Sequence, residues 1–143
     1  MKPILETIDT RFGTASKHAF SRGNTLPYTG VPFGMNYFVP QTSDQEGSWF
    51  FDPHLPIFQG VRLTHQPSPW IGDYSWLLLT PVTGEISSDS LFHRQSSYNL
   101  DRAIFNPHYL RIFSERYQIE TQLSPTCYGA SIQLRQIQGK KLS

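Results

Sequence analysis

The chain has 143 residues, of which 38% are hydrophobic, and this is enough for one domain with a single core. Twelve Lys and Arg residues against eleven Asp and Glu residues leave a net charge of +1 with no basic stripe, which disfavours nucleic acid or a membrane surface as a partner. Residues 1–20 carry charges where a signal peptide needs an apolar run, and no segment reaches transmembrane length, so we expect a cytoplasmic protein.

Aromatic residues, prolines and glycines favour strands and turns over helices. Phe, Tyr and Trp make up 14% of the chain, and eleven prolines interrupt it. The uncharged stretch GNTLPYTGVPFGM at residues 23–35 has the composition of a rigid loop. No segment keeps apolar residues at helical spacing for three turns, so helix should be minor.

Three regions show strand patterns, taken in chain order. The apolar run WLLLT at residues 76–80 predicts a strand buried on both faces. Residues 108–124 predict an antiparallel hairpin, and residues 130–135 predict a further strand. Alternate residues are expected to share one face of each strand: Tyr117, Ile119, Thr121 and Leu123 in the half-buried strand of the hairpin, and Ala130, Ile132 and Leu134 in the last strand.

These patterns predict an all-β fold, namely an antiparallel β-sandwich formed by residues 1–143 with little helix. The apolar strands are too few to close two full sheets. We therefore expect the chain to be a truncated domain or part of one.

The common catalytic and metal-binding motifs are not found in the sequence. The five histidines never fall at metal-ligand spacing, and no cysteine pair, nucleophile elbow or phosphate-binding loop is present. The single cysteine, Cys127, is expected to be a buried structural thiol rather than a nucleophile. No metal ligand and no catalytic residue is predicted in this chain.

Two acidic residues lie in the aromatic, turn-rich region. Asp52 precedes a proline, which is typical of a turn residue. Asp73 either caps a turn or projects into a site, and the sequence favours neither role. Their spacing does not reveal the paired carboxylates that glycoside hydrolysis requires.

The tryptophans are the more informative residues. Trp49 and Trp70 lie in Gly- and Pro-rich loops, whereas Trp76 opens the apolar run and is expected in the core. A loop tryptophan offers a flat apolar surface for stacking on a sugar. The residues alone favour the alternative, in which both rings cover the core.

Five stretches in order resemble the N-terminal domain of the glycoside hydrolase family 92 exo-α-mannosidases. The resemblance runs from about Arg11 to about Arg135 and includes GNTLPYTGVPFGM, LTH and GDYSWLLLTPVTG. The matching positions are Gly23, Asn24, Thr25, Pro27, Pro32, Phe33, Gly34, Met35, Gly60, Thr64, His65, Gly72, Asp73, Tyr74, Leu78, Pro81, Thr83 and Gly84. FNPHYLRIF and YQIETQLSPTCYGASIQLR are similar to two later stretches of the family.

The resemblance implies a supersandwich-like domain that packs against a C-terminal (α/α)6 barrel absent from this chain. It implies an inverting, calcium-dependent α-mannosidase acting on mannose-containing glycans, whose acid, base and most calcium ligands lie in that barrel. The chain alone is therefore expected to be inactive. In this setting the uncharged loop is suited to dock against another domain and to shape one wall of a pocket.

The resemblance also implies the substrate-binding residues. Trp49 corresponds to the tryptophan that contacts the sugar beyond the cleaved bond, while His65 and Asp73 match polar family positions. A polar stretch of the family is replaced here, with Arg62 and Leu63 at two of its positions. Arg62 and Trp70 are candidates to supply the missing contacts, so the linkage preference stays open.

Three classes of function remain open on the sequence. The first is the mannosidase domain, which needs downstream polypeptide for hydrolysis. The second is a stand-alone carbohydrate-binding module, and the third is a structural interaction module whose aromatic residues only pack. The first class also predicts an exposed apolar docking face and self-association of the isolated chain.

Overall fold

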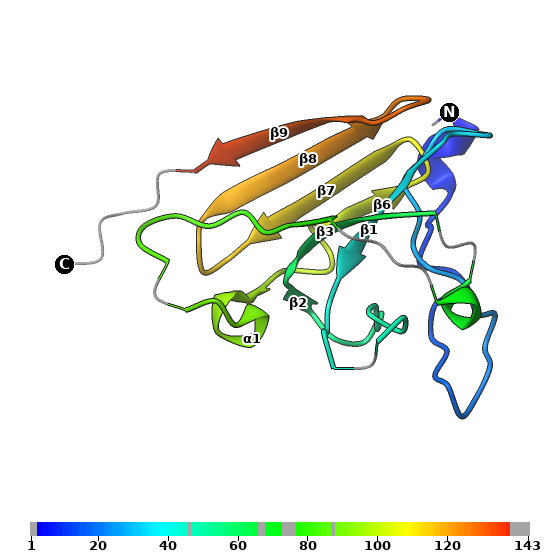
Figure 1. Ribbon diagram of the computed structural model, residues 1–143. Helices are drawn as coiled ribbons and strands as arrows, with labels where there is room; N and C mark the ends of the chain where they lie inside the picture. The colour runs from blue at the N-terminus through cyan, green and yellow to red at the C-terminus, as the bar shows by residue number, and fades with distance from the viewer. Residues whose placement is uncertain (1–2, 46, 66–67, 73–76, 87, 138–143) are drawn as a thin grey trace.

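The computed structural model describes residues 3–45, 47–65, 68–72, 77–86 and 88–137. Figure 1 shows two layers of strands joined by long loops. The strands are β1 (Tyr37–Gln41), β2 (Ile57–Phe58), β3 (Gly60–Thr64), β4 (Leu77–Leu79), β5 (Ser96–Ser97), β6 (Ile104–Asn106), β7 (Tyr109–Ser114), β8 (Ile119–Pro125) and β9 (Ala130–Gln136). The helical segments are the 3-10 turns η1 (Ile4–Thr7) and η2 (Pro69–Ile71) and the single-turn α1 (Leu91–Arg94).

Every strand pairing is antiparallel. One sheet has the order β6-β7-β8-β9, a second has the order β1-β3-β4, and β2 pairs with β5. Helix is confined to short turns, and no helix of the described segments is long and apolar enough to cross a membrane. The predicted all-β, antiparallel fold is confirmed.

The larger sheet contains the predicted hairpin. In β7, and in β8 from Ile119 to Leu123, every second side chain is buried, and Leu110 pairs with Leu123 in register. This follows from the two-residue period of a strand, which places alternate residues on one face. Strand β8 begins at Ile119 rather than Tyr117, because Gln118 takes a positive φ of 54° in the preceding turn.

The core lies between the two layers. β1 and β3 contribute Phe38, Val39 and Val61, and the facing sheet contributes Leu110 and Ile112, all of them buried. Strand β1 is buried along four consecutive residues, so side chains on both of its faces are covered, while β3 pairs with one edge and the segment at Thr29 with the other. The sandwich is therefore held together by contacts between the sheets.

The structure corrects the predicted burial of the apolar run at residues 76–80. The run does form a strand, but Leu77 is 46% exposed and Leu79 is 37% exposed. The reason is that β4 pairs with β3 at the edge of its sheet. Trp76 lies outside the described residues.

The predicted burial of Cys127 is also wrong. Cys127 is exposed in the tight turn between β8 and β9. The Thr126 amide donates to the Gly129 carbonyl at 2.7 Å, and this bond closes the turn around Cys127 and Tyr128. An apolar residue at a turn tip cannot reach the core, whatever its hydrophobicity.

Candidate functional site

Three aromatic rings from distant parts of the chain lie in a row at the surface. The Trp49 and Trp70 ring centroids are 5.2 Å apart in an edge-on arrangement, and the His18 and Trp70 centroids are 5.0 Å apart. Trp70 is 52% exposed and Trp49 is half-buried, so neither ring belongs to the core. We call His18, Trp70 and Trp49 the aromatic row.

Local structure explains why the two tryptophans face outward. Trp70 occupies the η2 turn, whose amide at Trp70 donates to Ser68 Oγ and whose end is set by Gly72 in the left-handed region. Trp49 directly precedes Phe50, which is only 3% exposed. The Thr42 amide donates to the Phe50 carbonyl at 2.8 Å, so the backbone beside Trp49 is anchored.

His18 is presented by a closed loop formed by residues 13–23. The loop is pinched at its neck, where a Cβ on Gly23 would lie 2.6 Å from the Gly13 Cα atom. Inside it, Ser16 Oγ accepts bonds from the amides of Arg22 and Asn24 at 2.7 and 3.0 Å. Loops of this size with adjacent ends are packed by their own contacts. We call it the neck-closed loop.

A hollow of about 270 Å³ borders the turn at residues 17–20 that carries His18. Its lining comes from the neck-closed loop and from the segment that follows Phe51: Ala15, Ser16, Lys17, Phe20, Arg22, Asp52 and His54. Asp52 Oδ1 accepts the His54 amide at 2.8 Å, which confirms the predicted turn role of this carboxylate. We call this cavity the loop hollow.

Arg62, a predicted site residue, packs on the ring of Phe50, which follows Trp49 in the chain. Its Nε donates to Gln41 Oε1 at 2.7 Å, and its guanidinium carbon lies 4.9 Å from the centre of the Phe50 ring. Gln41 is fully buried and donates in turn to Gln59 Oε1 at 2.8 Å. Arg62 is thus tied to a buried polar network as well as to an aromatic face.

The same network ends at a surface carboxylate. Gln59 Nε2 donates to Asp44 Oδ1 at 3.1 Å, and Gln45 Nε2 donates to the same oxygen at 3.0 Å. These side-chain hydrogen bonds from Gln45 and Gln59 hold the pKa of Asp44 below its usual value. The network therefore fixes β1 to β3 with charge-assisted bonds at its outer end.

The remaining predicted residues lie elsewhere or are not described. His65 follows the end of β3, and its Nε2 lies 2.7 Å from Asn36 Oδ1. Asp73 lies outside the described residues. Of the predicted site residues, Trp49 and Trp70 are therefore in direct contact. Arg62 contacts the ring of Phe50, the residue that follows Trp49, and His65 contacts Asn36 in the loop before β1.

Calcium requires six to eight oxygen ligands in one place. Among the residues that the structure describes, no three His, Cys, Asp or Glu side chains come together in a group that could hold a metal ion. We therefore place no calcium-dependent step of catalysis within this domain.

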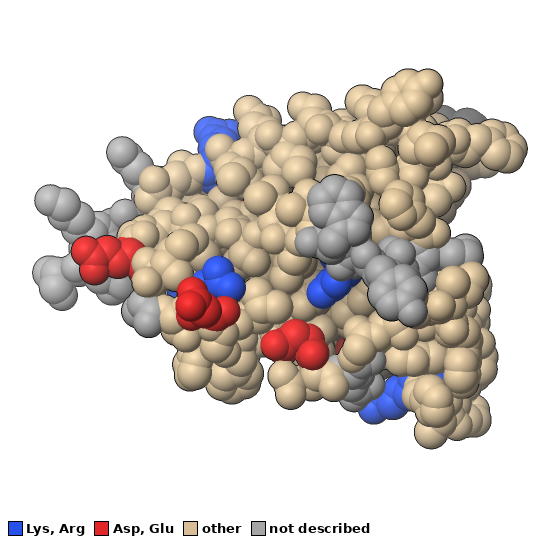
Figure 2. Space-filling model, viewed as in Figure 1, with Lys and Arg blue, Asp and Glu red and all other residues tan. Residues whose placement is uncertain are grey.

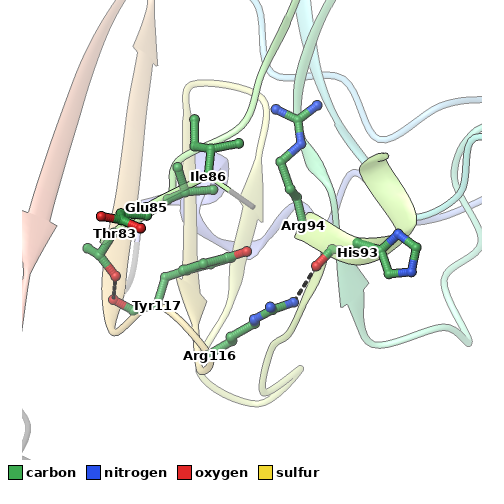
Figure 3. Close-up of a pocket in the computed structure, with 8 residues that line it drawn as sticks. Thr83, Glu85, Ile86, His93, Arg94, Arg116 and Tyr117 are labelled. Carbon is green, nitrogen blue, oxygen red and sulfur yellow. Dashed lines mark hydrogen bonds between the residues drawn. The ribbon is translucent and has the colours of Figure 1, made fainter. Parts of the chain in front are cut away.

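A second hollow, of about 260 Å³, lies at the turn that joins β7 to β8 (Figure 3). Arg116 reaches under α1, where its Nη1 donates to the carbonyl of His93, and Thr83 Oγ1 donates to the Tyr117 carbonyl at 3.1 Å. These bonds tie the β7–β8 turn to the segments beside it. The predicted site residues in the described segments do not line this hollow.

Charge is dispersed over the face that Figure 2 shows, where single basic and acidic side chains are separated by uncharged ones. A surface of this kind suits a neutral polar ligand better than a polyanion. The aromatic row supplies apolar ring faces, and the loop hollow supplies polar groups of both signs. Together they can contact a sugar through its C–H face and its hydroxyl groups.

Sequence reasoning missed His18 and the neck-closed loop. The signal was the pair of glycines at 13 and 23, both of which take positive φ values, 82° and 123°. Glycine pairs of this kind mark places where two backbone segments approach closely. That the loop tip meets Trp70 could not be read from spacing, because the two residues are distant in sequence.

Comparison with known proteins assigns the family. Residues 7–135 match the family model described as the glycosyl hydrolase family 92 N-terminal domain. Among solved structures, the family GH92 inverting mannosidase BT2199 of Bacteroides thetaiotaomicron VPI-5482 is similar, with a TM-score of 0.78 and 33% identity over 94% of this chain and 18% of that chain. No curated protein matches the sequence.

A more distant structure has the same fold. The family GH92 α-mannosidase BT3965 of Bacteroides thetaiotaomicron has a TM-score of 0.69 and 17% identity, again over 94% of this chain and 18% of that chain. The chain thus spans about a fifth of the length of either mannosidase. With a family model matching nearly its whole length, the chain belongs to the glycosyl hydrolase family 92 N-terminal domain family.

Proposed function

We propose that this domain belongs to an inverting, calcium-dependent α-mannosidase that removes terminal α-linked mannose, and that its aromatic row forms one wall of the sugar site. Family membership supports a glycosidase. The printed activity of the relative that is 33% identical, an inverting mannosidase, supports the mannoside substrate. Because this chain spans only 18% of that relative, the groups that cleave the bond are assigned to polypeptide outside the 143 residues.

The observation that carries the proposal is the contact between Trp49 and Trp70. Two tryptophans packed edge to ring at the surface hold each other in a fixed orientation, and their partial exposure leaves ring area free for a ligand. Arg62 holds the neighbouring Phe50 ring, which stiffens the support under Trp49. The wall is therefore organised before the substrate binds.

The test compares two substrates in the complete enzyme. Trp49→Ala should lower kcat/KM about tenfold more for an α-linked mannobiose than for an aryl α-mannoside, because the aryl group does not reproduce the sugar beyond the cleaved bond. Phe12→Ala, at a ring that is 92% exposed, is the matched control and should change neither value. Equal losses on both substrates would show that Trp49 serves packing alone.

The rest of the polypeptide is the proposed partner of the uncovered apolar strands. Leu77 and Leu79 of β4 are 46% and 37% exposed, and Leu134 of β9 is 50% exposed. Burying such side chains is worth about 25 cal/mol per Å² of apolar area. We propose that the catalytic part of the complete polypeptide covers these leucine side chains.

A stand-alone carbohydrate-binding module is the second candidate, favoured by the accessibility of the aromatic row in this chain. It predicts that the 143-residue chain binds an α-mannobiose measurably and that Trp49→Ala abolishes the binding. Calorimetric titration measures this directly. A domain that needs the catalytic part to complete its site should show no such affinity.

A further inference from the structure

The hollow at the turn that joins β7 to β8 brings together charged side chains from three segments of the chain. Arg94 comes from the end of α1, Arg116 from the turn itself, and Glu85 from the segment between β4 and α1. Figure 3 shows Arg94 on one side of this hollow, with Glu85 and Tyr117 on the other. We call this cavity the arginine hollow.

Both arginines are held in place by backbone carbonyl groups. Arg116 Nη1 donates to the carbonyl of His93, and Arg94 Nη2 donates to the carbonyl of Asp89 at 2.8 Å. A guanidinium group has five N–H donors, so each arginine keeps donors beyond these bonds. Two positive charges are therefore fixed beside the hollow with hydrogen-bonding capacity to spare.

Neither arginine is neutralised by a carboxylate of the described segments. Within those segments the only ion pair joins Asp9 to Arg11. In addition, Arg94 Nε is buried and has no hydrogen-bond partner among the described residues. A buried N–H group without an acceptor is costly and therefore uncommon in folded proteins. An acceptor atom of a ligand would satisfy this donor.

The charges that line the arginine hollow favour an anionic ligand. Arg94 and Arg116 supply two positive charges, and Glu85 supplies one negative charge. Arginine binds phosphate and carboxylate groups well, because its N–H donors match pairs of their oxygen atoms. Glu85 can accept hydrogen bonds but repels a second anion. A ligand with an acidic group at the arginines and hydroxyl groups near Glu85 would satisfy both sides.

The size of the hollow limits the ligand to a small one. Its volume of about 260 Å³ falls just below the range of about 300–1,000 Å³ typical of pockets for drug-sized ligands. Tyr117 adds a ring, whose centre lies 5.2 Å from the guanidinium carbon of Arg116. Thr83 Oγ1 donates to the Tyr117 carbonyl at 3.1 Å and so ties the segment before Glu85 to the turn. The hollow has room for one substituted ring.

We propose that the arginine hollow binds a small hydroxylated molecule that carries one acidic group, a phosphate or a carboxylate. Arg94 and Arg116 bind the acidic group, and Glu85 accepts hydrogen bonds from the hydroxyl groups. Sugar phosphates and sugar acids have this chemistry. The inference is independent of the proposed function, because none of the residues that carry it belongs to the aromatic row.

The test titrates glucose 6-phosphate, glucuronate and inorganic phosphate into the nitrogen-15-labelled 143-residue chain, with glucose as the uncharged control. The Nε–H signal of Arg94 is followed by NMR, because this is the donor that the acidic group should bind. Glucose 6-phosphate or glucuronate should shift the signal saturably with a Kd of about 1 mM or below, and glucose should not. The tighter of these two acids identifies the acidic group.

Two outcomes of this titration would overturn the proposal. The first is the absence of a saturable shift with both acids. The second concerns the hydroxyl groups, since inorganic phosphate lacks the sugar and should bind more weakly than glucose 6-phosphate. Equal affinity for these two compounds would show that the hollow does not recognise a hydroxylated molecule.

Two variants with opposite expected effects separate binding from folding, and calorimetry measures their affinities. Arg94→Gln should weaken binding of the tighter acid about tenfold or more. Glu85→Gln keeps a hydrogen-bond acceptor and removes a like charge, so it should strengthen binding of inorganic phosphate about 2- to 5-fold, which a damaged fold could not do. Arg102→Gln is the matched control, because the Arg102 guanidinium lies over the Phe113 ring and does not line the hollow. Unchanged affinity in Arg94→Gln, or weaker phosphate binding in Glu85→Gln, contradicts the proposed site.

Discussion

Tyr98 shows how burial alone shifts the titration of a side chain. It is 3% exposed, and its hydroxyl has no hydrogen-bond partner among the described residues. Desolvation raises the pKa of Tyr98 from 10.0 to about 12, against a smaller lowering influence of Arg11. The folded state therefore holds the phenol proton more tightly than the unfolded state does.

This predicts an alkaline loss of stability. The contribution is fully present below about pH 10 and is lost as the pH rises towards about 12, because the unfolded chain releases the proton first. The loss should reach roughly 2–3 kcal/mol. Urea unfolding between pH 8 and 12 measures it, with Tyr98→Phe as control. If the variant and the wild type lose stability in parallel, Tyr98 does not cause the loss.

Gly23 is a residue whose backbone geometry supports the site. It has a φ of 123°, and an added Cβ would lie 2.6 Å from backbone atoms of Gly13. Gly23→Ala should therefore lower the free energy of unfolding by about 3 kcal/mol or more. Gly47→Ala is the control, because Gly47 also has a positive φ of 59° but no atom within 4 Å of the added Cβ. It should cost only about 1–2 kcal/mol.

Chemical denaturation of both variants checks this difference. The contact between His18 and Trp70 should also loosen in Gly23→Ala, because the neck positions the tip of the loop, and tryptophan fluorescence reports on that contact. Similar free energies of unfolding for the two variants would mean that the segments at Gly13 and Gly23 can move apart at little cost in stability.

At the scale of elements, the edge strands explain how the isolated domain should behave. Leu79 on β4 and Leu134 on β9 are partly exposed at the ends of their sheets. Exposed apolar edge strands promote association between chains. We therefore expect the isolated domain to form dimers or larger species as its concentration rises.

Charge on these strands should suppress the association. Leu79→Lys combined with Leu134→Lys should shift the isolated domain towards monomer in analytical ultracentrifugation, with little loss of stability because neither side chain is buried. Ser131→Lys combined with Gln133→Lys is the control, since the pair adds the same two charges to the opposite face of β9. A monomeric wild type at all concentrations would contradict the expectation.

At the scale of the whole molecule, the proposed calcium dependence should separate this domain from the complete enzyme. No group of three metal-binding side chains occurs in the described part of the chain. Chelation should therefore leave the Tm of the 143-residue chain within about 1 °C, while abolishing hydrolysis by the complete enzyme. Calcium added back should restore the activity. A large fall in the domain's Tm on chelation would place a metal site within these residues.

The alternating strands were predictable because a strand's period is local. The pattern from Ile119 to Leu123 needs no knowledge of distant residues, and the antiparallel hairpin follows from the short turn before it. The sequence also placed Trp49 and Trp70 in loops, although the residues alone favoured rings that cover the core, and its ordered motifs resembled the family that the comparison confirms.

Local pattern misled where burial depends on neighbours. The apolar run ending at Thr80 looks like a central strand, yet β4 is an edge strand and leaves Leu77 exposed. Cys127 is as hydrophobic as many core residues, yet a turn holds it at the surface. Hydrophobicity makes burial of a side chain favourable, but the position of the residue in the fold decides whether the side chain is buried.

By itself, the sequence determined the strand type and the fold class through short-range spacing, and it indicated the family through the order of its motifs. Only the tertiary structure decided that His18, Trp70 and Trp49 form one row and that the loop hollow forms between the neck-closed loop and the segment after Phe51. These residues come from three loops whose ends are fixed by sheet pairing and by the close contact of Gly13 with Gly23. Their meeting depends on how the chain closes on itself in three dimensions, which no local pattern specifies.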